Sequence, residues 1–251
     1  SQLKNLTLAV NQLEGSLPAA ISNLQHLELL DLGSNKFQGE IPESFKEFKN
    51  LKILSLKKNN LTSIPDLWPK RTLNIPKLEI LDLQHNNISG ILPPGISEHR
   101  NLKIIRVNNN RFEGRFPPLP VTLKELDISN NKYKGNLPQY IKNAPGLQFL
   151  DISNNRFSGK FPEQIVKLEQ LVKFTATNNK LSGTILSDFK RWTKLKTFDV
   201  GNNRLTGIVP KFLQNIEKCN LAGNAMDCTI ATEELKKHCN ITCATQKQLN
   251  E

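Results

Sequence analysis

The chain has 251 residues and a formal net charge of +11, with 34 lysines and arginines against 23 aspartates and glutamates. A positive balance of this size favours acidic partners or anionic surfaces, although it also serves solubility alone. The sequence contains no apolar run long enough to cross a bilayer and no block of like charges typical of a disordered basic tail.

A single template of about 24 residues recurs along almost the whole chain. It is clearest in residues 147–170, LQFLDISNNRFSGKFPEQIVKLEQ, where Asn155, Gly159 and Pro162 stand at fixed places between leucine, isoleucine and phenylalanine. One copy has too little apolar surface to fold alone, so neighbouring copies must bury one another's leucines. The period therefore predicts stacked coils rather than a globular domain with one central core.

Nine repeats follow one another in register from the N-terminus. The fifth is short, because residues 116–122, FPPLPVT, replace the usual convex segment. The prolines exclude a helix there and predict an extended crossing. The eighth repeat has Leu186 where the template expects proline. The repeats start at Leu3, Leu27, Leu51, Leu78, Leu102, Leu123, Leu147, Leu171 and Leu195.

The third repeat departs most from the template. Ser63 replaces the glycine, and residues 67–77, LWPKRTLNIPK, lengthen the repeat. We interpret this segment as a surface insertion that places Trp68, Lys70 and Arg71 on a bulged convex loop.

Each repeat begins with an alternation of apolar and polar residues, which indicates a short strand with one buried face. An asparagine follows each strand where the chain turns away, and its amide offers a donor and an acceptor to buried backbone groups. We therefore expect a structural, hydrogen-bonded ladder of asparagines. Its members are Asn11, Asn35, Asn59, Asn86, Asn110, Asn131, Asn155, Asn179, Asn203 and Asn224.

The motif SxNxFxGxFP, formed by Ser153, Asn155, Phe157, Gly159 and residues 161–162, resembles the plant-type extracellular leucine-rich repeat class. The resemblance implies an α/β repeat solenoid, a right-handed leucine-rich repeat superhelix of about ten coils with a parallel concave β-sheet. It also implies that the LxGxIP half of each repeat adds a second sheet. The chain opens directly inside a repeat, without the paired-cysteine cap of the class or a signal-like start, which predicts a processed or partial chain.

We expect repeats one to nine, the first of them uncapped, over residues 1–215 and a degenerate tenth repeat with a disulfide-bonded cap over residues 216–251. The cap contains all four cysteines and a short helical run at residues 232–238. Such a helix would hold Cys228 and Cys239 too far apart for a direct bridge, which argues against Cys228–Cys239 and hence against Cys219–Cys243. A zinc site of the cysteines with His238 is the alternative. The cysteines are Cys219, Cys228, Cys239 and Cys243.

Four N-x-S/T sequons occur in the chain, and together with the clustered cysteines they predict a secreted, extracellular glycoprotein of the cell surface or cell wall. The acceptor residues are Asn5, Asn60, Asn87 and Asn240. If glycosylated, Asn60 and Asn87 would shield the third and fourth repeats and leave the fifth to ninth bare.

Catalysis has no support in the sequence. The four histidines, His26, His85, His99 and His238, are scattered over separate repeats and accompany no fixed acid and nucleophile. No phosphate-binding glycine loop or metal-binding histidine pair is present. We expect neither an enzyme nor a bound metal or cofactor.

Specificity should lie on variable positions of the strand face. The position after each ladder asparagine is basic from the fifth repeat onward: Arg111, Lys132, Arg156, Lys180 and Arg204. Arg106 interrupts an otherwise acidic column, and Phe149 ends an apolar column near the sheet edge. We hypothesise that these seven residues form a binding face whose arginines contact carboxylates or other anions. The alternatives are that the basic residues only fill a surface position and that the apolar column serves edge packing.

These observations predict a secreted, non-catalytic recognition module that binds a protein, peptide or cell-wall ligand on its concave face. The resemblance implies receptor ectodomains, receptor-like proteins or inhibitors of cell-wall polysaccharide hydrolases as precedents. The expected partner is a protein or peptide, acidic in character, or an anionic polysaccharide, and not a nucleic acid. Two alternatives are an adhesive surface protein, such as a protist surface antigen with a similar C-x-L-x-x-N-x-x-x-C cap, and an ice-binding protein.

Overall fold

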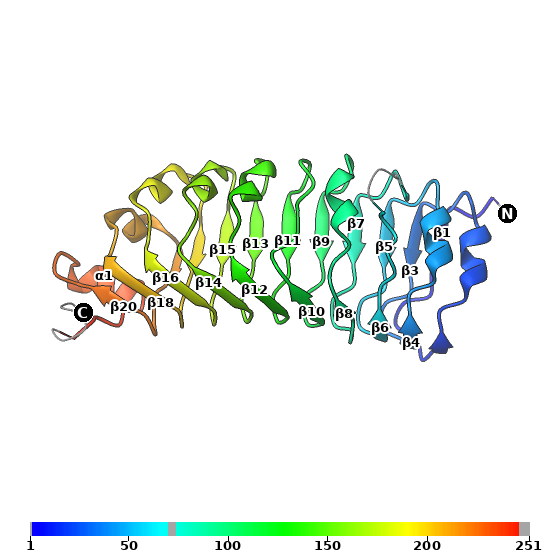
Figure 1. Ribbon diagram of the computed structural model, residues 1–251, viewed down its shortest axis with the longest axis horizontal. Helices are drawn as coiled ribbons and strands as arrows, with labels where there is room; N and C mark the ends of the chain where they lie inside the picture. The colour runs from blue at the N-terminus through cyan, green and yellow to red at the C-terminus, as the bar shows by residue number, and fades with distance from the viewer. Residues whose placement is uncertain (1, 70–73, 246–251) are drawn as a thin grey trace. The chain divides into compact units, whose positions relative to one another are not determined.

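The computed structural model describes residues 2–69 and 74–245, so the predicted loop positions Lys70 and Arg71 lie outside the described residues. The chain forms two compact units, Ser1–Lys132 and Tyr133–Glu251. In each unit the repeats stack as coils, and successive coils place their strands side by side in parallel sheets (Figure 1). The α/β leucine-rich repeat solenoid expected from the sequence is confirmed. The predicted division at residues 215 and 216 concerns the cap and stays a prediction.

The first sheet consists of the strands that open the repeats, paired in chain order and without a register shift. In the first unit Leu30 lies beside Leu54, and Leu54 lies beside Leu81. The strands of this unit are β1 (Asn5–Thr7), β3 (Leu29–Asp31), β5 (Ile53–Ser55), β7 (Ile80–Asp82), β9 (Ile104–Arg106) and β11 (Glu125–Asp127). Those of the second unit are β13 (Phe149–Asp151), β15 (Lys173–Thr175), β17 (Thr197–Asp199) and β19 (Lys218–Asn220).

The second sheet, expected from the resemblance, is formed by the strands that follow the ladder asparagines. In the first unit these are β2 (Glu14–Ser16), β4 (Lys36–Glu40), β6 (Asn60–Ser63), β8 (Ser89–Gly90) and β10 (Arg111–Gly114). In the second unit β14 (Arg156–Gly159), β16 (Lys180–Thr184), β18 (Arg204–Ile208) and β20 (Ala225–Asp227) follow β12 (Lys132–Asn136), whose first residue ends the first unit. In the first unit β2, β4 and β6 pair in parallel as a three-stranded sheet of their own, and β8 pairs in parallel with β10 in another; in the second unit β12, β14, β16, β18 and β20 pair in parallel in chain order.

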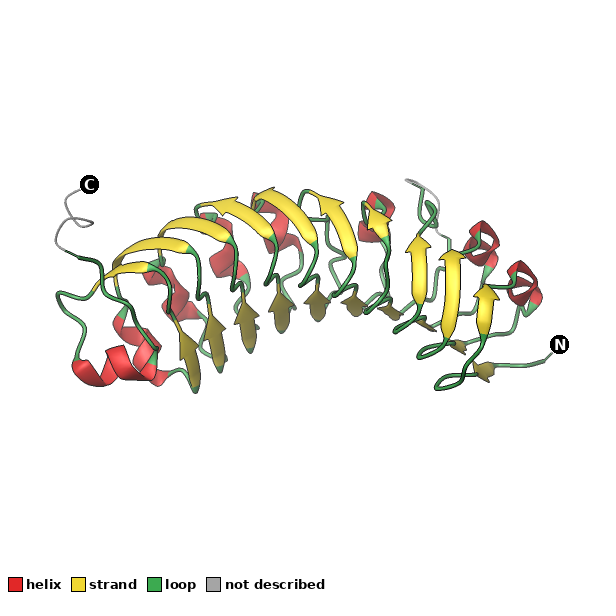
Figure 2. Cartoon of the chain, turned by 90° about the horizontal axis from the view of Figure 1, so that it is seen from below, coloured by secondary structure: helices red, strands yellow, loops and turns green. Residues whose placement is uncertain are grey.

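Short 3-10 helices lead from the second sheet to the next coil (red in Figure 2). Proline precedes six of the described helices and fixes φ near the value that the turn requires; Leu186 takes its place before η6 with a φ of −66°. No helix is assigned to residues 116–122, as their prolines predict. The helices are η1 (Ala19–Asn23), η2 (Glu43–Glu47), η3 (Pro94–Glu98), η4 (Gln139–Asn143), η5 (Glu163–Lys167), η6 (Ser187–Arg191) and η7 (Lys211–Asn215).

The asparagine ladder joins neighbouring coils through their backbones. Asn203 Nδ2 donates to the carbonyl of Ala176 in the preceding coil at 2.9 Å and to that of Val200 in its own coil at 3.0 Å. Its Oδ1 accepts from the N–H of Leu181 at 2.9 Å. The same pattern holds at Asn59, so the predicted structural ladder is confirmed.

The insertion in the third repeat contributes to the core. Trp68 has no exposed surface, so its predicted place on a solvent-exposed loop is wrong. Its ring meets the buried His99 edge-on, with ring centroids 5.8 Å apart. A Cβ on Gly95 would stand 1.7 Å from the carbonyl oxygen of Trp68, so only glycine allows the insertion to lie this close to η3. Trp68 is buried because it packs closely against the next coil, a contact that the repeat pattern does not predict.

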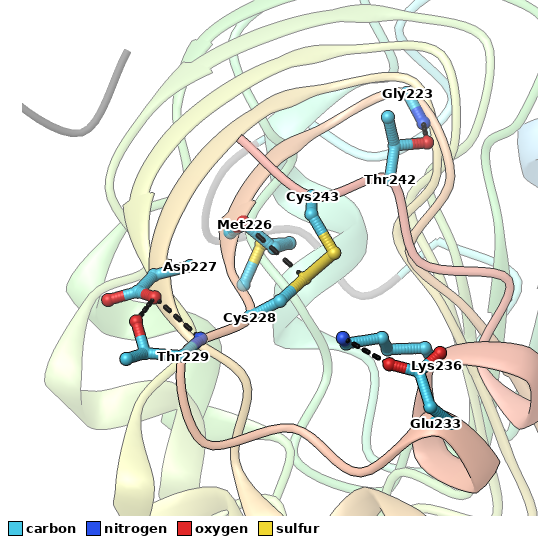
Figure 3. Close-up of a disulfide and its surroundings, with 9 residues drawn as sticks. All are labelled: Gly223, Met226, Asp227, Cys228, Thr229, Glu233, Lys236, Thr242 and Cys243. Atoms are coloured by element: carbon cyan, nitrogen blue, oxygen red, sulfur yellow. Dashed lines mark hydrogen bonds and ion pairs between the residues drawn. A yellow bond between two sulfur atoms is a disulfide. The ribbon is translucent and has the colours of Figure 1, made fainter. Parts of the chain in front are cut away.

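The C-terminal cap contains α1 (Glu233–His238), whose N-cap Thr232 accepts a hydrogen bond from the N–H of Leu235 at 3.2 Å. Disulfides join Cys219 to Cys239 and Cys228 to Cys243. This pairing agrees with the predicted exclusion of Cys228–Cys239, and it overturns the zinc alternative, because all four thiols are used. Figure 3 shows Cys243 beside Met226, with which it forms an isolated parallel bridge.

Candidate functional site

The seven predicted binding residues are divided between the two sheets and between the two units. Arg106 and Phe149 lie on first-sheet strands, β9 and β13. The other five each begin a second-sheet strand, with exposed side chains: Arg111 on β10, Lys132 on β12, Arg156 on β14, Lys180 on β16 and Arg204 on β18. The structure therefore presents two kinds of surface where the sequence predicted one strand face.

Arg106 is held by a carboxylate of its own unit. Its Nε donates to Glu125 Oε1 at 2.6 Å, and its Nη2 donates to Glu125 Oε2 at 3.0 Å. Asp82 and Asp127 lie beside Arg106 on the neighbouring strands. The hydrogen bonds that Arg106 donates to Glu125 raise the pKa of its guanidinium further above its usual range. Arg106 thus balances a group of carboxylates, and little of its charge is free for a ligand.

In the second unit, the first sheet presents an uncovered aromatic ring. Phe149 begins β13 and is 41% exposed, and Lys173 is its neighbour on β15. Lys173 Nζ lies 3.5 Å from Asp151 Oδ2. Thr197 and Lys218 continue this row across the sheet. The predicted alternative of edge packing describes Phe149 poorly, because two fifths of its surface meets solvent.

A second set of asparagines stands one position before the ladder, and we call Asn154, Asn178 and Asn202 the exposed asparagine file. Each has a left-handed φ of 52–53°, which asparagine tolerates better than most residues. Asn178 Nδ2 donates to Asn154 Oδ1 at 2.6 Å, and Asn202 Nδ2 donates to Asn178 Oδ1 at 2.9 Å. The file runs across three coils, and its asparagines stand three residues after the ends of β13, β15 and β17, the strands that carry the row of Phe149.

Asp199 lies between the row and the file and is half-buried. Burial raises its pKa, while hydrogen bonds from the N–H of Gly201 and from Asn220 Nδ2 act in the opposite direction. Both bonds fix the carboxylate in place. Asp199 is therefore a fixed part of this surface rather than a free acid.

Glu125 and the exposed asparagine file are the features that the sequence reasoning missed. The file had a signal: residue pairs Asn-Asn recur at 109–110, 130–131, 154–155, 178–179 and 202–203. Only the second asparagine of each pair was identified, as a member of the ladder. Its left-handed backbone, visible only in the coil, turns the side chain to solvent.

The sequon asparagines Asn5, Asn60 and Asn240 are exposed, and Asn87 is half-buried. Their glycosylation stays a prediction. Within residues 2–69 and 74–245, no three or more histidine, cysteine, aspartate or glutamate side chains are placed to hold a metal ion. Nor does any helix in these ranges have the length and apolar character needed to span a membrane.

Two family models of leucine-rich repeats match the chain, one over residues 1–61 and 49–112 and the other over residues 122–144, 146–168 and 194–216. Together they cover more than half of it. A search of curated proteins found no significant match.

Solved structures of leucine-rich repeat proteins superpose well. The PEPR1–AtPEP1 structure is 26% identical over 89% of this chain and 35% of that chain, with a TM-score of 0.74. A plant ice-binding protein is 25% identical over 92% of this chain and 76% of that one, with a TM-score of 0.77. The ectodomain of the Arabidopsis receptor kinase HAESA, in complex with an IDA peptide hormone, is 26% identical over 89% of this chain, with a TM-score of 0.57.

The chain spans 35% of the PEPR1 structure's chain and 46% of the HAESA ectodomain. The family models, the parallel sheets and the asparagine ladder all indicate a leucine-rich repeat protein. The chain belongs to the leucine-rich repeat family, and its repeats are of the plant extracellular type.

Proposed function

We propose that the chain is an extracellular, non-catalytic recognition module that binds a peptide on the first-sheet face of its second unit. The observation that carries this proposal is the exposed ring of Phe149 on β13 together with the exposed asparagine file, which follows the ends of β13, β15 and β17. An apolar anchor beside a row of amides suits a peptide, because a peptide offers both side chains and unpaired backbone groups.

The exposed asparagine file has hydrogen-bonding capacity to spare. A primary amide carries two N–H donors and a carbonyl oxygen with two lone pairs. Within the file, Asn178 uses one donor on Asn154 and one acceptor site for Asn202. The remaining N–H and lone pair face solvent and are available to the backbone of an extended ligand, as in other recognition of peptide main chains.

Similarity to known proteins supports the same class of ligand. The HAESA ectodomain binds a peptide hormone and shares 26% identity with this chain. The two disulfides of the cap support an extracellular setting, since disulfides persist in oxidising compartments. Two hydrogen bonds fix the Asp199 carboxylate in place, and a fixed side chain suits a recognition surface.

Site-specific photocrosslinking tests the proposal. A photoreactive phenylalanine analogue at Phe149 should crosslink a peptide from an extracellular fraction of the source tissue. The matched control is the same analogue at Tyr140, which is similarly exposed, 38% against 41%, but lies on η4. Crosslinks that are equal at the two positions, or absent at Phe149, would contradict the proposal.

Ice binding is a second candidate, because the plant ice-binding protein matches this chain closely in length and fold. The regular spacing of the exposed asparagine file favours it. The long charged side chains of Lys173 and Lys218, in the row of Phe149 on the first sheet, oppose it, since an ice-binding surface needs flat arrays of small groups. Thermal hysteresis of the purified chain, measured against Asn178→Lys, would identify this function.

A further inference from the structure

The exposed face of the second sheet in the second unit carries five cations. Lys134, Arg156, Lys180 and Arg204 come from β12, β14, β16 and β18, and Lys160 follows β14 directly. We call these five residues the basic face. In β14, β16 and β18 the residue after the cation is buried, and in β12 Lys134 follows the buried Tyr133, so the period of two places these four cations on the exposed side of the sheet.

Strand register arranges the basic face as a diagonal. Lys180 lies beside Ser158 rather than beside Arg156, and Arg204 lies beside Ser182 rather than beside Lys180. Each coil is thus offset by two residues from the one before. With strands 4.8 Å apart and about 3.3 Å per residue, successive cations stand roughly 8 Å apart at their Cα atoms. Lys134, in contrast, is the direct neighbour of Arg156.

Within residues 2–69 and 74–245 these cations have no ion-pair partner. No ion pair among the described residues includes a member of the basic face. The acidic residue that strands β12, β14, β16, β18 and β20 contain, Asp227, already accepts hydrogen bonds from the N–H and the hydroxyl of Thr229. Like charges on neighbouring strands, as at Lys134 and Arg156, are unfavourable, and a bound anion would relieve their repulsion.

The corresponding strands of the first unit, which belong to two sheets, carry a different charge pattern. There Glu14, Glu40 and Glu113 are interleaved with Lys36 and Arg111, all with exposed side chains. Two glycosylation sequons, at Asn60 and Asn87, also fall on or beside the strands of that unit's second sheet. An excess of unpaired cations is therefore a property of the second unit and not a general consequence of the repeat.

Hydroxyl groups alternate with the cations of the basic face. Ser158 is the register neighbour of Lys180, Ser182 is that of Arg204, and Thr184 lies beside Thr206. The stem of Lys160 lies over Gly183, where an added Cβ would come within 2.8 Å of Lys160 Cγ. The face combines positive charges with small hydrogen-bonding groups at regular intervals.

We propose that the basic face binds an anionic polysaccharide whose sugar units carry carboxylates, a uronate polymer. Its carboxylates would pair with the cations, and its hydroxyls would bond the serines and threonines between them. Nucleic acid is a poorer fit, because the strands of this face expose no aromatic ring for base stacking. An acidic peptide would find only Ile208 as an exposed apolar contact. This surface and its ligand are separate from the peptide face.

Binding of polygalacturonic acid to the purified chain, measured by titration calorimetry at low and high salt, tests the proposal. The triple variant Arg156→Ser, Lys180→Ser, Arg204→Ser should lose roughly tenfold or more in affinity, since exposed pairs contribute modestly and add up. The matched control, Lys142→Ser, Lys190→Ser, Lys211→Ser, removes the same charge from exposed residues of η4, η6 and η7 and should bind as the unaltered chain does.

Three further measurements decide between sources of binding. The double variant Lys134→Ser, Lys160→Ser should also weaken binding, whereas Phe149→Ala should not, because it alters the other sheet. Fully methyl-esterified polygalacturonate, which keeps the sugars but loses the charge, should bind far more weakly. Equal binding of polyglutamate, equal loss in the control triple variant, or no binding of polygalacturonic acid would each overturn the proposal.

Discussion

Arg106 and Glu125 form a two-point ion pair on the first sheet of the first unit, with N–O distances of 2.6 and 3.0 Å. Both side chains are about two-thirds or more covered, since 34% and 24% of their side-chain surface is exposed. The register neighbours Asp82 and Asp127 add two carboxyl groups. Arg106 is therefore the cation that allows these acids to lie together.

We expect Arg106→Ala to lower the free energy of unfolding by about 1–2 kcal/mol at pH 7, because carboxylates lose their counter-charge in a partly buried place. Urea denaturation at pH 7 measures this loss. Lys103→Ala is the control: its 2.6 Å pair with Glu79 is more exposed, and its removal should change stability by less than about 0.5 kcal/mol. An equal effect of the two substitutions would contradict the assignment.

The free energy of unfolding should be sensitive to substitution of Asn203, a buried asparagine of the ladder. Asn203→Ala leaves the N–H of Leu181 without its partner, and the carbonyl of Ala176 keeps only the longer hydrogen bond from Asn179 Nδ2. We expect a loss of about 1–3 kcal/mol in the free energy of unfolding, since a buried backbone N–H is left unsatisfied. Asn203→Asp, which keeps the acceptor for Leu181 but loses the donors, should not restore stability. Chemical denaturation of both variants measures this, and a loss below about 1 kcal/mol for Asn203→Ala would count against a structural ladder.

Val10 occupies the same left-handed place in its coil as Asn178 does in a later one, with φ values of 58° and 53°. A β-branched residue is strained in this region, whereas asparagine tolerates it. Val10 is also 81% exposed, so its side chain contributes little packing. Val10→Asn should therefore stabilise the first unit by about 1 kcal/mol, and Asn178→Val should destabilise the second by about 1–2 kcal/mol. Hydrogen exchange in each unit reports both effects, which must have opposite signs.

His99 predicts a pH dependence of stability. Burial against Trp68 lowers the pKa of the His99 ring to about 4 from 6.5, and neither ring nitrogen has a hydrogen-bond partner among the residues that the structure describes. Between these values the unfolded chain binds a proton that the folded chain does not. Stability is thus complete above about pH 6.5 and falls, by no more than about 3 kcal/mol, as the pH drops toward 4.

His99→Phe should remove this part of the pH dependence, because a ring of similar shape remains against Trp68 without a titrating group. Denaturation midpoints between pH 4 and 7 measure the change. His26→Phe, at an exposed histidine, should leave the slope as it is. An unchanged slope in His99→Phe would show that other groups cause it.

The disulfide Cys219–Cys239 fastens α1 to strand β19, and the N–H of Leu221 donates to the carbonyl of Cys239 at 2.8 Å. Replacing both cysteines by serine should lower the stability of the second unit by about 2–4 kcal/mol, because the unfolded cap gains freedom. Limited proteolysis should then cut first within the cap. Cleavage that starts instead in the first unit would contradict a covering role for this segment.

The sequence by itself determined the repeated elements of this protein. The residues within each coil specify its local structure. Alternation of apolar and polar residues defines the strand, asparagine satisfies the backbone of the turn, and proline starts the helical turn. Every copy of the repeat therefore predicts the same elements. The ladder at Asn203 and the exclusion of Cys228–Cys239 follow from these short-range rules. Coil-to-coil contacts of the ladder could be predicted because the period makes equivalent residues neighbours in the first sheet.

Only the tertiary structure decided how residues outside the template meet. The two-residue offset that places Lys180 beside Ser158 depends on hydrogen-bond register in the second sheet, which the period leaves open. The burial of Trp68 depends on Gly95 in the next coil, and the pairing of Arg106 with Glu125 depends on side-chain reach across two strands. Such contacts are set by packing between coils, where non-equivalent positions become neighbours, and no pattern within one repeat encodes them.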